Sequence, residues 1–482
     1  MFNIVWLKRD LRLFDHEPLQ KAIESGHPTI LLFVIEPILL KSEDYSQRHW
    51  QFMRDCIKDM QVSLGPFHNE TLLLLEGNFI EILQTFIEHL GNFILYSHQE
   101  TGNSITFGRD RQTKEWCKKY SIEWKEFRQH AVERGRMNRN DWDKQWYSFM
   151  TSPICSPNLS DLKKLEFDRE IFEKYKIKYK VTTNNFIQRG GTTLAMEHLA
   201  TFLNSRIKNY SKHISKPFES RTSCSRLSAH LSWGSLSIRY LYQKTIVSPT
   251  ERNRNFKNFV SRLHWHCHFI QKLESDPSIE FSNQNISFDS IRKHCNHDFL
   301  KRYENGSTGI PIVDASIRCL NQTGYLNFRL RAMLVSFWTH LLWQPWNSIS
   351  KYLARQFTDF EPGIHYTQIQ MQASTVGYHT IRIYNPTKLA FDHDPACKFI
   401  KKWVPELKNL PVDLCIEPWK INPMEEEFYQ FNLKQDYFIP IVDILPALKN
   451  ASKSLHTIKS KKETRIKSHQ IMQIHVNTKK KG

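Results

Sequence analysis

Four short apolar runs near the start of the chain constrain its fold more than any other feature. The runs are Ile4–Leu7, Ile30–Ile35, Leu72–Leu75 and Phe93–Tyr96. Stretches with helical periodicity, such as Arg48–Leu64 and Phe79–Leu90, separate them. Because runs that are apolar throughout are typical of strands covered on both faces, residues 1–130 are predicted to form a doubly wound parallel α/β domain. Neither GxGxxG nor GxxxxGK[ST] occurs in the sequence, so a dinucleotide held by a glycine fingerprint is not expected there.

The rest of the chain has a different pattern. Residues 131–195 mix polar and aromatic residues without a clear period and are predicted to form a connector. Helical periods then dominate, so residues 196–448 are predicted to form an all-helical domain. The predicted helices cover Leu194–Ile207, Leu227–Ile246, Phe256–Leu273, Ile312–Leu320, Arg329–Leu342 and Ile349–Phe357. Residues 449–482 are interpreted as a basic C-terminal tail, a frayed helix followed by a loose end.

Charge and cysteine content narrow the class of protein. The net charge is +18; residues 449–482 hold ten Lys and Arg and one acid, which gives +9 and leaves 18 − 9 = +9 for the body. A basic body suits a polyanionic partner, most commonly nucleic acid, whereas a basic tail alone is more often a solvated end. The nine cysteines include no CxxC pair, which argues against a zinc ribbon or a secreted disulfide scaffold. Without a signal peptide or an apolar run of about eighteen residues, a soluble, cytoplasmic protein is expected.

Polar groups recur among the apolar residues of the helical half, where burial is costly unless they are paired. Ser225 and Ser228 open a predicted helix, a position that suits a phosphate or an ordinary helix cap. Arg329 and Arg331 lie in an apolar helix, where an arginine that faces inward needs an acid, and the stretch Asp359–Glu361 can supply one. Such a pair is either purely structural or flanks a charged aromatic ring.

In this order, these features resemble the photolyase/cryptochrome family of flavoproteins. The motifs that carry the resemblance are VWLKRDLRLFDHEPL (Val5–Leu19), SRLSAHLSWGSLSIR (Ser225–Arg239), TGIPIVDASIRCLNQTGYLNFRLR (Thr308–Arg331), RIYNP (Arg382–Pro386) and KFIKKWVPEL (Lys398–Leu407). The resemblance covers most of the chain. It implies an α/β plus all-α protein, in which an antenna-type α/β domain precedes an all-helical domain that binds FAD.

The resemblance also implies which residues bind FAD. They are Tyr210, Ser225, Leu227, Ser228, His266, Phe328, Arg331, Asp359, Glu361 and His365. Among them, Arg331 and Asp359 match an ion pair that flanks the flavin ring, and Glu361 matches an acid at the polar edge of that ring. His365 matches the residue beside the reactive ring nitrogen, where a donor or a positive charge favours a reduced anion.

The implied activity is light-driven repair of UV-damaged DNA by electron transfer from reduced FAD to a pyrimidine dimer, which must leave the base stack. Trp265 matches an aromatic that stacks on the flipped lesion, although core packing explains it nearly as well. Arg262 stands where a lesion-contacting glutamate is usual. These two residues and His365 are the predicted catalytic residues of an enzyme that is expected to be a monomer.

The electron relay departs from the family pattern. Ile369 replaces the tryptophan nearest the flavin and Met371 a second pocket tryptophan, whereas Trp346 keeps the middle position of the relay and is the predicted electron-transfer residue. The three-tryptophan relay is therefore predicted to be broken. The residues that are alternative carriers or ordinary core residues are Trp338, Trp343, Tyr352 and Tyr366.

Other functions and cofactors are weighed against this prediction. A cryptochrome-type blue-light photoreceptor without repair activity is the main alternative, and a nucleic-acid-binding protein without cofactor is the weaker one. Glu100 follows a strand where the family can bind a second antenna chromophore, a folate or a deazaflavin, but surface loops often carry such acids. No metal site is expected at His264 and His268, which lack an acidic third ligand. No iron–sulfur cluster is predicted either, because the cysteines form no tight motif.

Overall fold

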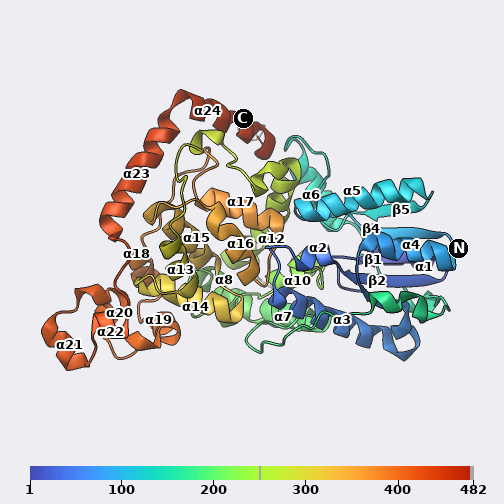
Figure 1. Cartoon of the computed structure of the whole chain (residues 1–482), viewed down its shortest axis with the longest axis horizontal. Helices are drawn as coiled ribbons and strands as arrows, with labels where there is room; N and C mark the ends of the chain where they lie inside the picture. Colours follow the sequence, from blue (N-terminus) through green and yellow to red (C-terminus); the bar gives the residue numbers. More distant parts are fainter. Residues whose placement is uncertain (249–250, 478–482) are drawn as a thin grey trace.

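The computed structural model describes residues 1–248 and 251–477, and its N-terminal domain is built on one parallel sheet (Figure 1). The strands are β1 (Phe2–Leu7), β2 (Thr29–Ile35), β3 (Leu72–Glu76), β4 (Phe93–His98) and β5 (Glu123–Phe127). Their order is β3-β2-β1-β4-β5 and all neighbours are parallel. The helices of this domain are α1 (Glu17–Glu24), α2 (Pro37–Leu40), α3 (Gln47–His68), α4 (Phe79–Leu90) and α5 (Ser104–Lys119). The predicted doubly wound α/β fold is thus confirmed.

Burial explains which strands the sequence revealed. Every residue of β1 and β2 is buried, because both strands have neighbours on two sides and helices over both faces. The edge strand β5 is half-exposed and carries two glutamates and a lysine. It therefore lacks the apolar run by which the other four were recognised.

The second half is helical, as predicted, and the described residues after Phe127 contain no strand. Its helices are α6 (Trp142–Thr151), α7 (Thr192–Asn204), α8 (Tyr210–His213), α9 (Ser220–Ser223), α10 (Ser228–Ser232), α11 (Ile238–Val247), α12 (Arg254–Ser275), α13 (His297–Asn305), α14 (Pro311–Thr323), α15 (Phe328–Ser336), α16 (Asn347–Gln356), α17 (Pro362–Gln372), α18 (Pro386–His393), α19 (Lys398–Trp403), α20 (Val412–Ile416), α21 (Pro423–Tyr429), α22 (Leu433–Asp436), α23 (Ile444–Ser460) and α24 (Lys462–His475). The long helices α12 and α17 pack against each other at its centre.

One of the predicted helices is divided into two in the structure. The stretch Leu227–Ile246 divides into α10 and α11, because Gly234 adopts a left-handed conformation (φ +72°) and Ser237 caps the second helix by accepting from the Tyr240 N–H. A side chain at Gly234 would collide with the Arg9 carbonyl at 2.1 Å. The break is therefore required for the two domains to meet.

The segment expected to be a connector contributes to the helical core. Helix α6 lies within residues 131–195, and its Trp142, Trp146 and Met150 are buried in one cluster with Phe202 and Leu263. After α6, residues up to Gly191 form only short turns of 3-10 helix. The absence of a clear period in the sequence reflects these short elements.

The C-terminal residues are helical up to His475, where a frayed helix was expected from the sequence. Helix α23 buries Leu455 and Ile458 in a cluster with Phe288, and α24 buries Thr464 and Ile471. The two helices run along one border of the helical domain (Figure 1). The last lysines of the chain, at 479–481, lie outside the described residues. No helix of the described segments has both the length and the apolar character of a membrane span.

Candidate functional site

A deep cavity enters the helical domain between α10, α12, α15 and α17. Its outer part has a volume of about 300 Å³ and its inner part about 120 Å³. The two parts share wall residues from α15 and α17, so they form one continuous space. The shared residues are Phe328, Arg331, Asp359, Ile364 and Gln368.

All but one of the predicted site residues line this cavity. Those in the outer part are Tyr210, Ser225, Leu227, Ser228, Arg262, Trp265, His266, Phe328, Arg331 and Asp359. Glu361 and His365 line the inner part. Trp346 lies elsewhere: it lines a separate pocket and donates its indole N–H to Asn283 Oδ1 at 2.8 Å. The structure thus brings the predicted cofactor-binding and lesion-binding residues together.

Arg331 and Asp359 form a two-pronged ion pair at the junction of the two parts. The two guanidinium nitrogens Nη1 and Nη2 lie 3.0 and 2.9 Å from the two carboxylate oxygens. Burial would raise the pKa of Asp359, but the facing guanidinium holds that pKa below its ordinary value. A bidentate pair of this kind is fixed in direction and carries one charge of each sign into the cavity.

Glu361 is the second buried acid, and its partner comes from the other domain. Arg9, which follows β1, places Nη2 3.2 Å from Glu361 Oε2. Despite this partner, burial raises the pKa of Glu361 to about 7. Oε1 of Glu361 and Nη1 of Arg9 have no hydrogen-bond partner among the described residues. Because Glu361 lines the cavity, its Oε1 is left for a ligand to satisfy.

His365 is positioned by α16. Its Nε2 lies 2.9 Å from the Ser350 carbonyl, which can only accept, so Nε2 carries the proton. Burial lowers the pKa of His365 to about 4. The imidazole is therefore neutral near pH 7, and its Nδ1 is an acceptor. The neutral imidazole thus brings no positive charge to the cavity.

The segment between α9 and α10 supplies an arginine that the sequence did not reveal. Arg226 lies between Ser225 and Leu227 with a left-handed backbone (φ +61°), and its guanidinium stacks 3.5 Å from the centre of the Tyr325 ring. Nη1 of Arg226 is buried without a partner among the described residues. It faces the same wall as the serines predicted to hold phosphates. A cation at this place is suited to an anionic ligand.

The mouth of the cavity is aromatic and basic. Trp265 and Phe328 are each 45% exposed, although both line the cavity. The guanidinium of Arg262 lies 4.1 Å from the centre of the Trp265 ring. Trp265 is therefore not a core residue, which removes the alternative left open by the sequence. Two exposed ring faces beside a cation form a surface on which a base can stack.

His266 adds to the set of unsatisfied groups. Both of its ring nitrogens are buried without a partner among the residues that the structure describes. Burial lowers its pKa to about 4. With Glu361 and Arg226, it gives the cavity donors and acceptors that match a ligand with polar ring edges and phosphates. The residues present therefore fit FAD.

The position of the electron relay that lies nearest the cavity holds an apolar residue. Ile369 lines the inner part where the family carries tryptophan. Tyr366 lies behind it in α17, with its ring centre 5.2 Å from that of His365. Its hydroxyl donates to Asp44 at 2.6 Å and accepts from Lys351 at 2.9 Å. Tyr366 thus contacts a cavity-lining side chain and has a proton acceptor, which makes it a candidate carrier.

The crevice of the α/β domain is filled by an ion-pair network. It lies beyond the carboxyl ends of β1, β2 and β4, where ligands of such sheets usually bind, and its volume is about 30 Å³. Arg109 bridges Glu36 and Glu100 at 2.7 Å each and Asp110 at 2.9 Å, and lies 4.6 Å from the centre of the Trp6 ring. Glu100 is thus a buried ion-pair member and not a surface acid. The space left suits a water molecule, not a chromophore.

One group of possible metal ligands occurs among the described residues, and it lies outside the cavity. Asp10 Oδ2 is 2.6 Å from His98 Nδ1 and 3.0 Å from His16 Nε2. Nδ1 of His16 accepts from the Leu19 N–H, so its proton is on Nε2 and faces the carboxylate. Asp10 is therefore a buried carboxylate hydrogen-bonded to His98, with the protonated nitrogen of His16 facing it. His264, the other candidate, contacts Asp143 at 3.0 Å.

Comparisons with known proteins agree with this site. The family model of the FAD binding domain of DNA photolyase matches residues 259–457, and the DNA photolyase model matches residues 3–151. A deoxyribodipyrimidine photo-lyase of Alkalihalophilus pseudofirmus is 25% identical over 471 residues, 91% of this chain and 94% of the relative. A cryptochrome DASH of Gloeobacter violaceus is 24% identical over 469 residues, 92% of this chain and 93% of the relative.

Among solved structures, a class III photolyase from Agrobacterium tumefaciens has a TM-score of 0.81 at 22% identity and covers 95% of this chain and 98% of its own. This likeness extends the match through both domains and through the region between the two family models. The chain therefore belongs to the photolyase/cryptochrome family and binds FAD in its helical domain.

Proposed function

We propose that this protein is a light-driven DNA repair enzyme that splits pyrimidine dimers. When bound, reduced FAD supplies the excited-state electron that cleaves the dimer and takes the same electron back. The observation that carries the proposal is the mouth of the cavity, where Trp265 and Phe328 are exposed, Arg262 lies against the Trp265 ring, and the Arg331–Asp359 pair lines the same space. A flipped dimer needs such a stacking surface and a path to the flavin.

Each residue has a definite part in this proposal. Trp265 stacks on the flipped bases, and Arg262 donates hydrogen bonds to a phosphate or a base carbonyl, in place of the usual glutamate. Arg331 and Asp359 fix the orientation of the flavin ring. His365, as a neutral imidazole with its proton on Nε2, accepts a hydrogen bond from the ring at Nδ1 and has no second proton to donate to it.

The test compares dimer-containing DNA with and without light in the presence of the chemically reduced protein. Light-dependent loss of dimers, reduced at least tenfold by Trp265→Ala, is the expected result. A variant that has lost flavin would be inactive for another reason, so the flavin absorbance of Trp265→Ala is measured before the repair assay. Dimers that persist in light with flavin fully bound would contradict repair.

A blue-light photoreceptor is the second candidate, and the substitution of the lesion-contacting acid by Arg262 favours it. A sensor requires flavin photochemistry but no grip on a lesion. If the protein is a sensor, illumination leaves the dimers intact. It also causes a conformational change that persists in the dark, which is measured as altered protease sensitivity. The comparisons include relatives of both kinds.

The α/β domain is proposed to hold no second chromophore in its crevice, because the network around Arg109 fills that space. Extraction of the purified protein is then expected to yield FAD alone. Recovery of a stoichiometric folate, deazaflavin or second flavin would contradict this proposal.

A further inference from the structure

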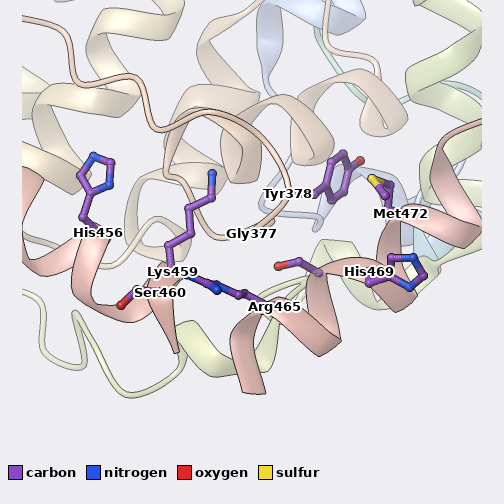
Figure 2. Close-up of a pocket in the computed structure, with 9 residues that line it drawn as sticks. Gly377, Tyr378, His456, Lys459, Ser460, Arg465, His469 and Met472 are labelled. Atoms are coloured by element: carbon purple, nitrogen blue, oxygen red, sulfur yellow. The ribbon is translucent and has the colours of Figure 1, made fainter. Parts of the chain in front are cut away.

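A second, larger pocket lies between the two C-terminal helices and the loop before α18. Its volume is about 480 Å³, and Lys459, Arg465, His456 and His469 line it together with Tyr378. Figure 2 shows Lys459 and Arg465 near the loop that carries Gly377, with His456 and His469 at opposite ends. No residue of the described wall is acidic. The pocket thus presents positive charge only.

The loop and helix α24 are held together tightly, so the pocket is a built feature. Gly377 has φ +89°, and an added Cβ would lie 2.2 Å from Ser468 Oγ and 2.6 Å from Asn285 Nδ2. Asn285 donates to Ser468 at 3.0 Å, and Lys459 donates to the His379 carbonyl at 2.6 Å. These contacts fix the spacing of the two walls.

Neither cation at the centre of the pocket is neutralised by the protein. Among the described residues, no carboxylate forms an ion pair with Lys459 or Arg465, and Arg465 is exposed. Neighbouring cations without acids repel one another, so a bound anion stabilises them. A phosphate group, with its several acceptor oxygens, is the ligand that satisfies such donors best.

The position of the pocket indicates the source of the phosphate. Tyr378, in its wall, accepts a hydrogen bond from Lys272 at 2.9 Å, and Lys272 belongs to α12, the helix that carries Trp265. Seven residues separate Trp265 from Lys272, which is about 10 Å along the helix. Successive phosphates of one strand are about 3.4 Å apart along the axis, so this corresponds to about three nucleotides.

We infer that this pocket, formed by Tyr378, Lys459, Arg465 and their neighbours, binds a backbone phosphate of DNA a few nucleotides from the base held at Trp265. The inference rests on the proposed function for the position of the DNA, but the contact itself is independent of sequence and of damage. It extends the DNA-binding surface onto helices α23 and α24.

The experiment uses the full-length, FAD-loaded protein and an undamaged, fluorescently labelled duplex of about 30 base pairs, at a series of salt concentrations. Arg465→Gln is expected to weaken binding about tenfold and to make the plot of log K against log salt shallower by about one. Lys467→Gln is the matched control, since it removes the same charge from an exposed position of α24 outside the pocket. Its effect is expected to be less than about twofold.

Three outcomes would overturn the inference. Equal losses of duplex affinity in Arg465→Gln and Lys467→Gln would mean that only the overall positive field matters. Unchanged affinity in both variants would show that DNA does not bind in the pocket. Inorganic phosphate that raises the melting temperature of wild type but not of Arg465→Gln, with duplex affinity unchanged, would assign the pocket to a free anion.

A further experiment distinguishes a failure of the phosphate site from a failure of the proposed repair activity. With a dimer-containing dinucleotide, which is too short to reach the pocket, Arg465→Gln is expected to split dimers as fast as wild type in light. Failure of both proteins on this substrate, with normal duplex binding, would refute repair and leave the phosphate site intact.

Discussion

Glu361→Gln tests the electrostatics of the cavity, because the ionised carboxylate is costly at this position. The side chain is 3% exposed, and burial raises its pKa from the ordinary value of 4.5 to about 7 even though Arg9 lies 3.2 Å away. A folded-state pKa above the unfolded value means that the folded protein binds more protons between these two pH values. Stability of the flavin-free protein is therefore expected to increase as the pH falls from about 7 to about 4.5.

The size of the effect follows from the shift in pKa. A difference of about 2.5 units corresponds to about 3 kcal/mol, which is the cost of keeping Glu361 ionised in the folded protein above pH 7. Glutamine has the same shape, no charge, and an oxygen that still accepts from Arg9. The variant is thus expected to be more stable than wild type by about 3 kcal/mol at pH 8 and equally stable near pH 4.5. For a chain of this length that is a rise of about 3 °C in melting temperature.

Thermal unfolding of both flavin-free proteins at half-unit steps from pH 5 to pH 8 measures this difference. Other buried groups that titrate here, such as Lys272 with a pKa lowered to about 7 by burial, are common to both proteins and cancel. A melting-temperature difference that is constant across the range, or that favours wild type at pH 8, would refute the assignment of Glu361 as an acid made costly by burial.

Further predictions concern the ion pair and the electron route. Asp359→Ala leaves Arg331 buried without its carboxylate and is expected to release flavin, so that the ratio of flavin to protein absorbance falls several-fold; an unchanged ratio would show that Asp359 does not flank the ring. Trp346→Phe is expected to change the rate of flavin photoreduction little, because Trp346 lines neither part of the cavity. Tyr366→Phe is expected to slow photoreduction more, since it removes the hydroxyl that donates its proton to Asp44; the opposite order would place Trp346 on the route.

The sequence predicted the fold where burial dictates composition. Strands β1 and β2 are covered on both faces and could be recognised as apolar runs, whereas the edge strand β5 could not. Helix α4 was predicted with its observed bounds, Phe79–Leu90, because its apolar stripe and its cap at Asn78 agree. At the C-terminus only a frayed helix was predicted, because charge dominates the composition of α23 and α24 and few residues form their buried faces.

The site was predicted best where motif and chemistry coincide. Arg331, Asp359 and Glu361 stand out in the sequence as charges among apolar residues. Arg226 was missed because it lies between two residues of interest and acts through an unusual backbone conformation that composition does not reveal. The tautomer of His365 could not be predicted from the sequence, since the hydrogen bond from Nε2 to the Ser350 carbonyl depends on the packing of another helix.

The N-terminal motif Val5–Leu19 makes contacts with the helical domain as well as within its own domain. Arg9 donates from Nε to the Ser232 carbonyl and from Nη2 to Glu361, and its guanidinium lies 4.7 Å from the centre of the Trp233 ring. Gly234 allows the Arg9 carbonyl to approach. With its own crevice filled around Arg109, the α/β domain helps to position Glu361 of the cavity through Arg9, which follows β1. A substitution of Arg9 is therefore expected to disturb flavin binding although it lies in the other domain.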